Sequence, residues 1–190
     1  SVDLTNLQRQ ILFSMDDVGA PKVEAAARRL AAINPEPDYV GVARRVGPGE
    51  LVALAADADV VLDCTDNFAT RHAINRACVA ARKPLVSGAA IRFDGQLAVY
   101  DSRDASSPCY HCLFGEGDDL EETRCATMGV FAPLVGIIGT MQAAEALKLL
   151  IGIGSSLAGR LQMLDARSME WNEIRMARQP ACAVCSRLRG

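Results

Sequence analysis

Two widely separated Cys-x-x-Cys pairs constrain the fold of this 190-residue sequence more than any other feature. The segment PCYHC contains Cys109 and Cys112, and the segment ACAVC contains Cys182 and Cys185. Four thiolates arranged in two such pairs match a structural zinc site, in which Zn–S distances are about 2.3 Å. One ion bound by all four would force these two segments together in space. It would act as a staple, because four cysteines leave no coordination position open to a substrate.

Redox-active pairs and free thiols are the alternatives to zinc. A thioredoxin-type Cys-x-x-Cys begins a helix directly after a strand. Neither pair has that context, because Cys109 follows a Ser-Ser-Pro turn and Cys182 follows Pro180. Seven cysteines in a chain that is half apolar also disfavour a secreted, disulfide-rich domain. No signal-peptide pattern precedes the first element, so we expect a reducing cytoplasm.

Charge and hydropathy exclude two classes of partner. The net charge of -3 and the pI near 5.4 disfavour nucleic-acid binding. The apolar stretch 129–154 is long enough to cross a membrane. However, Gln142, Glu145 and Lys148 fall on one helical face and make its second half amphipathic. We therefore expect a helix in the core or at a subunit interface, and no membrane span.

The order of elements predicts an α/β fold. The apolar run Val60–Leu62, the helix that follows it and the segment PLVSGAA give the strand–helix–strand order of a parallel sheet. Asp94-Gly95 between two strand-like runs indicates a hairpin, and 159–176 a second one. The other predicted elements are a helix over 21–34, a possible strand around 39–43, helices over 48–58 and 68–83, and a long helix within 129–154.

Asp66 is the first candidate for chemistry. It comes directly after the predicted strand, in LDCTDN. Ligands of open α/β sheets bind at the carboxyl ends of the strands, and a carboxylate there can hold Mg²⁺ beside a nucleotide's phosphates. The alternative is that Asp66 only caps the next helix, as Thr65 and Asn67 also could.

Two cations near the start of the chain are weaker candidates. Lys22 lies in the first turn of a predicted helix, where the helix dipole disfavours a cation. It is either simply solvated or placed to meet an anion at the helix start. Arg9 in NLQRQ is a second cation nearby in sequence.

Three cysteines lie outside the two pairs. Cys64 and Cys78 fall in strand and helix patterns, and we expect both in the core. Cys125 follows an acidic, glycine-containing segment, and we expect a mobile loop over about 113–125. Cys125 is then either an exposed loop thiol or a mobile nucleophile near a helix start.

Taken in order, the motifs resemble the ThiF/MoeB/HesA family over essentially the whole chain. They are NLQRQ, GAPKVE, VVLDCTDN, PLVSGAA, PCYHC, GVFAPLVGIIGTMQAAEALKLL and the final Cys-x-x-Cys. The family is related to ubiquitin-activating E1 enzymes, and its members adenylate small sulfur-carrier proteins. The resemblance implies one Rossmann-like E1 domain over 1–190. Its mixed sheet would have a parallel part followed by antiparallel hairpins, with a zinc site made of four cysteines.

The resemblance also implies a reaction. ATP and Mg²⁺ activate the C-terminal glycine of a ubiquitin-like carrier of the ThiS/MoaD type, with release of pyrophosphate. A sulfur-donor protein then acts on the adenylate, in thiamin or molybdopterin biosynthesis, and the enzyme is a homodimer. The matching residues are Asn6, Arg9, Gln10 and Lys22 for the nucleotide, Asp66 for Mg²⁺, Cys109, Cys112, Cys182 and Cys185 for zinc, and Cys125 for a covalent link to the carrier or its sulfur.

The sequence departs from the family pattern at its beginning. Family members start with a strand, a GxGGxG loop and a second strand, and none of these occurs in the 190 residues. The expectation is therefore a chain that corresponds to the C-terminal three-quarters of the enzyme and binds ATP weakly alone. The alternative function is a catalytically silent, zinc-stapled protein that binds the carrier. A nicotinamide dehydrogenase is disfavoured, because the dinucleotide fingerprint is also absent.

Overall fold

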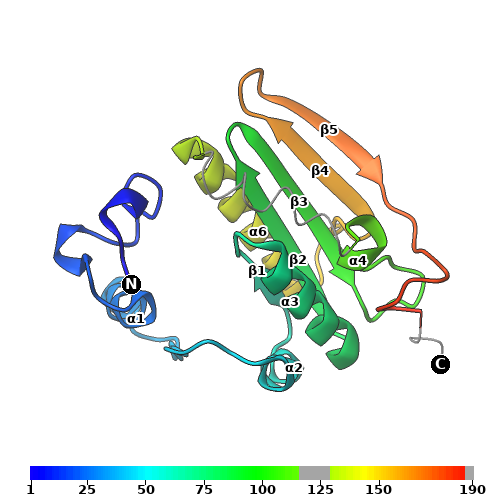
Figure 1. The fold of residues 1–190 in the computed structure, drawn as a ribbon, viewed down its shortest axis with the longest axis horizontal. Helices are drawn as coiled ribbons and strands as arrows, with labels where there is room; N and C mark the ends of the chain where they lie inside the picture. Colours follow the sequence, from blue (N-terminus) through cyan, green and yellow to red (C-terminus); the bar gives the residue numbers. More distant parts are fainter. Residues whose placement is uncertain (116–128, 187–190) are drawn as a thin grey trace. The chain divides into compact units, whose positions relative to one another are not determined.

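The computed structural model describes residues 1–115 and 129–186 (Figure 1). The chain forms two compact units, Ser1–Val46 and Gly47–Gly190. The single domain over 1–190 stays a prediction. Most of the loop predicted to be mobile, together with Cys125, lies outside the described residues.

The first unit holds two short 3-10 helices, η1 (Leu4–Asn6) and η2 (Met15–Asp17), and the helix α1 (Lys22–Ile33). The helix predicted after Pro21 is therefore confirmed. The Val2 N–H donates to the Ala20 carbonyl at 2.8 Å, and the Gly19 N–H donates to the Val2 carbonyl at 2.9 Å. These two bonds hold the start of the chain beside the start of α1.

The strand predicted around 39–43 is wrong. This segment has no regular secondary structure, and Val40 is 88% exposed. Its β-branched and aromatic residues favour a strand, but no described strand pairs with it. A strand needs a partner for its backbone groups, and a single-sequence pattern does not report whether one exists.

The second unit contains a five-stranded mixed sheet in the order β1-β2-β3-β4-β5 (Figure 1). Only β1 and β2 are parallel, joined by α3, and each later pair is antiparallel. The predicted parallel part followed by antiparallel hairpins is thus confirmed. The elements are α2 (Pro48–Asp57), β1 (Val61–Asp63), α3 (Phe68–Ala81), β2 (Pro84–Ile91), β3 (Asp94–Asp101), α4 (Tyr110–Leu113), α6 (Ala132–Ile151), β4 (Arg160–Asp165) and β5 (Glu170–Arg175).

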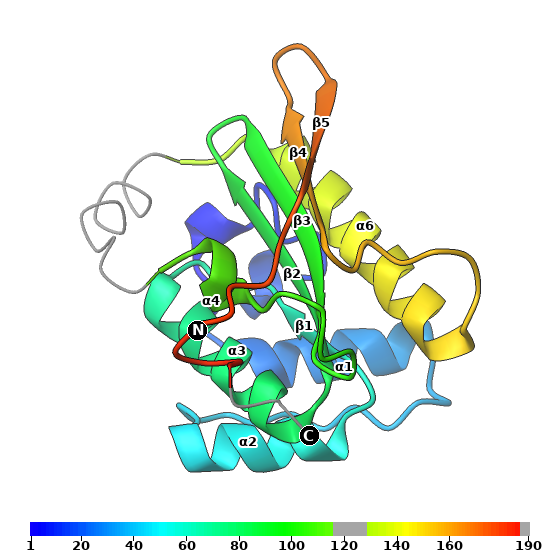
Figure 2. The same cartoon turned by 90° about the vertical axis from the view of Figure 1, so that its right-hand side faces the viewer.

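Helices cover both faces of this sheet. Figures 1 and 2 show α6 on one face, and α3 with α4 on the other. Side chains alternate accordingly along β2, because successive residues of a strand point to opposite faces. Leu85 packs with Ile74 of α3, whereas Val86 packs with Ala146 of α6. The sheet is therefore the middle layer of the unit, and the carboxyl ends of β1 and β2 lie between these two helical layers.

The first hairpin is present, but its turn differs from the prediction. Ile91 pairs with Asp94, so Arg92 and Phe93 form the two-residue turn, and Arg92 takes a left-handed φ of 50°. Gly95 lies inside β3 instead. A Cβ on it would come within 2.8 Å of side-chain atoms of Ile138 in α6. The glycine therefore permits the helix to approach the sheet, which the sequence pattern could not distinguish from a turn.

Two polar residues of α6 lie on the face that packs against the rest of the unit. Gln142 is 3% exposed and faces the sheet, while Leu147 and Leu150 are each 55% exposed. Glu145 is buried too, where its carboxylate accepts the Leu157 N–H at 2.9 Å. By length and composition α6 passes the test for a membrane span, but one face packs on β2 and β3. Specific hydrogen bonds explain why polar side chains occupy the packed face.

Candidate active site and metal centre

The loop after β1 presents Asp66 at the carboxyl edge of the sheet. The Asp63 carboxylate, at the end of β1, accepts the backbone N–H of Thr65 at 2.9 Å and its hydroxyl at 2.7 Å. This is the local turn that an aspartate side chain stabilises. Asn67 caps α3, because its Oδ1 accepts the Thr70 N–H at 2.9 Å. The capping role considered for Asp66 therefore belongs to Asn67.

Two aspartates three residues apart have opposite environments. Asp63 is 1% exposed, and Arg71 donates to it at 3.2 Å. Asp66 is exposed, and within the described part of the second unit its carboxylate makes no hydrogen bond or ion pair. A carboxylate left free at the carboxyl end of a strand is available to a cation, whereas one buried against an arginine is not.

Sequence reasoning missed a buried polar group beneath this loop. Arg71 of α3 and Gln142 of α6 both reach the ends of β1 and β2, from opposite faces of the sheet. Gln142 Nε2 donates to the Asp63 carbonyl at 2.8 Å and to the Val86 carbonyl at 3.3 Å. A Cβ at Gly88 would lie 2.3 Å from Gln142 Oε1. No sequence signal reveals these partners, since long polar side chains on helices are usually solvated.

The first unit places three of the predicted nucleotide contacts in one turn. The N–H groups of Arg9 and Gln10 donate to the Asn6 carbonyl at 3.0 and 2.9 Å. Gln10 Oε1 is buried and has no hydrogen-bond partner among the described residues. Lys22 is the first residue of α1, as expected. The chain thus holds a buried acceptor without a described partner next in sequence to the half-exposed Arg9, and buried polar groups are usually hydrogen-bonded.

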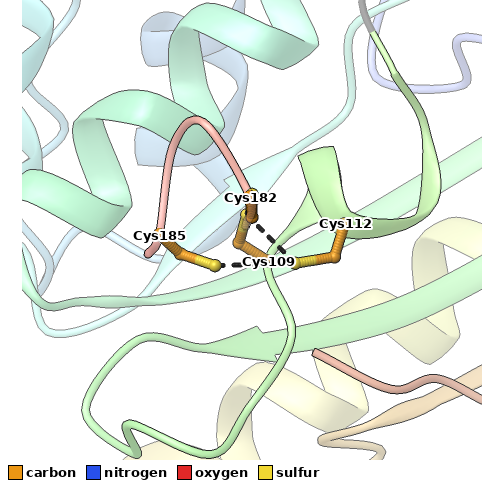
Figure 3. Close-up of side chains that lie close together, drawn as sticks. All are labelled: Cys109, Cys112, Cys182 and Cys185. Carbon is orange, nitrogen blue, oxygen red and sulfur yellow. Dashed lines mark hydrogen bonds between the residues drawn. The ribbon is translucent and has the colours of Figure 1, made fainter. Parts of the chain in front are cut away.

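The four paired cysteines meet, as the spacing predicted. Figure 3 shows their side chains converging from the α4 region and from the turn near residue 182. All four Sγ atoms lie within 4.8 Å of one another, and all four residues are buried. The Sγ atom of Cys109 is 3.9 Å from that of Cys112 and 3.7 Å from that of Cys182. None of these pairs is a disulfide, in which the S–S distance is about 2.05 Å.

These distances fit a tetrahedral metal ion. Four ligands about 2.3 Å from a central zinc are about 3.8 Å apart. Three of the S–S distances are 3.5, 3.7 and 3.9 Å, and the others are within 4.8 Å. Burial raises the pKa of Cys109 and Cys112 above the ordinary thiol value. A bound cation is what would keep such thiols ionised, and the donor set fits zinc.

Chain groups also contact the sulfur atoms. Asn75 of α3 donates through Nδ2 to Cys109 Sγ at 3.7 Å, and the Gln179 N–H donates to Cys112 Sγ at 3.5 Å. Hydrogen-bond donors around ligating atoms orient them and stabilise their negative charge. Asn75 is a further residue that sequence reasoning missed.

The isolated cysteines divide differently from the expectation. Cys78 is buried, and burial raises its pKa to about 12. The prediction that Cys64 is in the core is wrong, because the residue is exposed. Its Sγ lies 3.6 Å from Gln142 Oε1, at the end of the sheet rather than within it. Cys64 is exposed and not in the core because it follows Asp63, the last residue of β1.

Comparison with known proteins assigns this architecture to a family of nucleotide-using enzymes. The ThiF family profile matches residues 1–184, so the chain belongs to the ThiF family. The molybdopterin-synthase adenylyltransferase of Escherichia coli K12 is 47% identical over 97% of this chain and 74% of its own length. The sulfur carrier protein ThiS adenylyltransferase of the same organism is 44% identical over 97% and 72%. The predicted class, a nucleotidyltransferase of this family, is thereby confirmed.

A solved structure supports the fold independently. E. coli MccB, crystallised with ATP, superimposes with a TM-score of 0.82 at 25% sequence identity. The match covers 97% of this chain and 56% of MccB. The chain therefore spans a little over half the length of that solved protein, and the E1-like fold class is confirmed.

Proposed function

We propose that this chain takes part in the ATP-dependent adenylation of the C-terminal glycine of a ubiquitin-like sulfur-carrier protein. The observation that carries the proposal is Asp66, an exposed carboxylate without a described partner in its own unit, directly after β1. The names of the two E. coli relatives support the reaction class. The crystallisation of MccB with ATP supports the nucleotide.

The proposed chemistry is a single displacement. A carboxylate oxygen of the carrier's last glycine attacks the α-phosphorus of ATP, and the bond from that phosphorus to the bridging oxygen breaks. Pyrophosphate leaves with the electron pair, and the acyl-adenylate forms. No protein base is needed, because a C-terminal carboxyl group with a pKa near 3.3–3.7 is already ionised at neutral pH.

The chain's own residues would position and neutralise charge. Asp66 would hold Mg²⁺, which supplies charge stabilisation at the phosphates when bound. Arg9 and Lys22 would contact phosphate oxygens, and positive groups there stabilise the charge that develops on the leaving pyrophosphate. Asn6 and Gln10 would contact the nucleotide, and the unpartnered Gln10 Oε1 supports a donor group of the ligand at that point.

The partners follow from the same proposal. The carrier is of the ThiS or MoaD type, and one relative is named for the sulfur carrier protein ThiS and the other for molybdopterin synthase. A sulfur-donor protein would act next, with Cys125 as the residue that links to the carrier or its sulfur. The exposed apolar end of α6, with Leu147, Leu150 and Ile151, supports a homodimer contact. The proposal also includes zinc bound by the four cysteines and a location in a reducing cytoplasm.

Replacing Asp66 by asparagine tests the function. In the protein produced from its complete gene, Asp66→Asn should lower carrier-dependent ATP–pyrophosphate exchange by about 10²–10³-fold while the fold is retained, because one well-placed charge contact is lost. Exchange should be measured with each candidate carrier, which also separates the two pathways. Asp59→Asn, at the exposed segment before β1, is the matched control and should retain activity.

Two results would contradict this proposal. Near-normal exchange in Asp66→Asn would remove Asp66 from the site. Tight carrier binding without exchange, in the unmodified protein and with every carrier, would instead favour the silent carrier-binding protein.

A further inference from the structure

Arg71 is a buried cation whose hydrogen bonds all end at one edge of the sheet. Its side chain is 9% exposed. Nη1 donates to Asp63 Oδ2 and to Ser87 Oγ, both at 3.2 Å. Nη2 donates to the Gly88 carbonyl at 2.9 Å and to the Thr65 carbonyl. One guanidinium therefore joins the ends of β1 and β2 to the loop between β1 and α3.

The Thr65 contact is the informative one. The Thr65 carbonyl belongs to the peptide group that directly precedes Asp66, so Arg71 fixes the backbone that carries this carboxylate. The Asp63 turn fixes the same residue from its other side, through the Thr65 N–H. Only guanidinium offers five donors in a rigid planar fork, which a lysine ammonium cannot reproduce.

Neutralising a buried carboxylate does not by itself explain this arrangement. A buried ion pair can often be replaced by apolar residues without loss of stability. Two of the acceptors of Arg71 are uncharged backbone carbonyls, of Thr65 and Gly88, on two different elements. Those contacts set a distance between the loop and β2, which charge balance does not require.

The opposite face of the sheet reinforces the same edge. Gln142 binds the carbonyl groups of Asp63 and Val86 from α6. The end of β1 is thus held by α3 from one side and by α6 from the other. A loop anchored this way keeps its exposed residue in one place without contacting that residue's side chain.

We propose that Arg71 is a positioning residue for Asp66: it holds the Asp63–Asn67 loop in the geometry that adenylation needs, without touching substrate. The inference rests on the function proposed for Asp66. It assigns the catalytic effect of Arg71 to the backbone carbonyl contacts, and the ion pair with Asp63 to charge balance.

The first test separates positioning from folding with a conservative change. Arg71→Lys keeps the charge and loses the fork, so kcat for pyrophosphate exchange should fall by about a hundredfold, as expected for a misplacement near 1 Å. The KM for the carrier should stay within about twofold, because a positioning effect acts on the transition state more than on ground-state binding. Arg103→Lys, which alters an exposed pair with Asp101, is the matched control and should be fully active. Full activity of Arg71→Lys would overturn the proposal.

A double variant covers the case in which single changes unfold the protein. Arg71→Met with Asp63→Asn removes both charges, and the asparagine keeps an Oδ1 acceptor for Thr65. We expect this variant to fold better than Arg71→Met alone and still to be impaired by about a hundredfold in kcat. Recovery of wild-type kcat in the double variant would show that Arg71 only balances the charge of Asp63, and would overturn the proposal.

Hydrogen–deuterium exchange provides a readout that does not depend on the reaction. In Arg71→Lys, the amides of Thr65 and Thr70 should exchange about tenfold faster, as expected when one charge-assisted hydrogen bond is lost, while the amides of β3 keep their protection. Unchanged protection of Thr65 would refute the positioning role. An unmodified protein that shows no pyrophosphate exchange would refute the proposed function instead, so the two failures are distinguishable.

Discussion

Two buried polar clusters lie along one helix, and they differ in whether the chain completes them. The cluster around Asp63 and Arg71 pairs every charge with groups of the chain itself. The four-cysteine cluster offers sulfur atoms mainly to one another, at 3.5 to 3.9 Å. Burial of unpaired polar groups is costly, so an incomplete cluster indicates a missing ligand. A complete cluster indicates a fixed local geometry, here that of the loop that carries Asp66.

Helix α3 connects the two clusters. Arg71 and Asn75 are four residues apart, so they lie on one helical face. Asn75 Oδ1 accepts the Tyr110 N–H at 3.0 Å, which turns its Nδ2 group toward Cys109 Sγ. The segment that carries Asp66 and the segment that carries two cysteines are therefore held by the same rigid element. The two clusters can be distinguished by the treatment that disrupts them. A chelator should disrupt the cysteine cluster, whereas a change of side chain should disrupt the cluster around Asp63 and Arg71.

Metal removal should have the largest effect. Cys182→Ser should abolish binding of one zinc per chain and destabilise the second unit by several kcal/mol, since metal affinity at structural sites of this kind amounts to about 10–16 kcal/mol in small peptides. Elemental analysis and urea unfolding, with and without chelator, measure both quantities. Cys64→Ser, at an exposed cysteine outside the cluster, should keep the zinc. Absence of metal in freshly purified, reduced protein would contradict the view that a metal ion completes the cysteine cluster.

The sequence predicted those parts of the molecule that local pattern determines. Alternating and helical patterns located most of the helices and strands, and the motifs located Asp66 and the four cysteines. Most of the failures share one cause, which is that a partner far away in sequence decides the outcome; Cys64, which lies directly after the end of β1, is the exception. Gly95 packs against helix α6 and is not part of a turn. Residues 39–43 have no strand to pair with among the described residues. Gln142 points inward because it donates hydrogen bonds to carbonyl groups of β1 and β2.

Crowding the complete cluster should have an intermediate effect. In Gly88→Ala, the new Cβ would lie 2.3 Å from Gln142 Cδ and Oε1, so the Gln142 side chain must shift. It would then lose its bond to the Asp63 carbonyl, and we expect a destabilisation of about 1–3 kcal/mol, the usual cost of overpacking. Chemical denaturation measures it, and chelator should not change the difference from the unmodified protein.

Gly49→Ala is the matched control for that variant. Gly49 lies in α2, and a Cβ there would meet nothing within 4 Å. Alanine is the better helix former by up to about 1 kcal/mol, so stability should be unchanged or higher. A Gly88→Ala protein as stable as Gly49→Ala would mean that Gln142 adapts freely, and the edge of the sheet would then be less rigid than its hydrogen bonds indicate.

The smallest effect is expected at a third polar cluster, which lies in the first unit and is also complete. The Asp17 carboxylate accepts the Ser14 backbone N–H at 2.9 Å, and Arg29 and Arg28 donate to it at 2.8 and 2.5 Å. These contacts, the Ser14 N–H first, lower the pKa of Asp17 from 3.8 to about 2. Chelator should leave this cluster unchanged, whereas acid should disrupt it.

The sign of the pH dependence follows from the lowered pKa. A carboxyl group that is more acidic in the folded state stabilises it fully above the unfolded value of 3.8, and this contribution is lost as the pH falls through about 2. Asp17→Asn should therefore destabilise the first unit at neutral pH, and the difference from the unmodified protein should shrink between pH 4 and pH 2.

Acid also releases zinc from thiolates, so the measurement must be local to the first unit. Hydrogen exchange of the α1 amides provides this, with Asp38→Asn, an exposed aspartate of the same unit, as the control. A difference that stays constant down to pH 2 would mean that the charge of Asp17 does not stabilise the unit. The hydrogen bond from the Ser14 N–H would then stabilise the unit equally well with a neutral acceptor. Acid would no longer distinguish this cluster from the cysteine site.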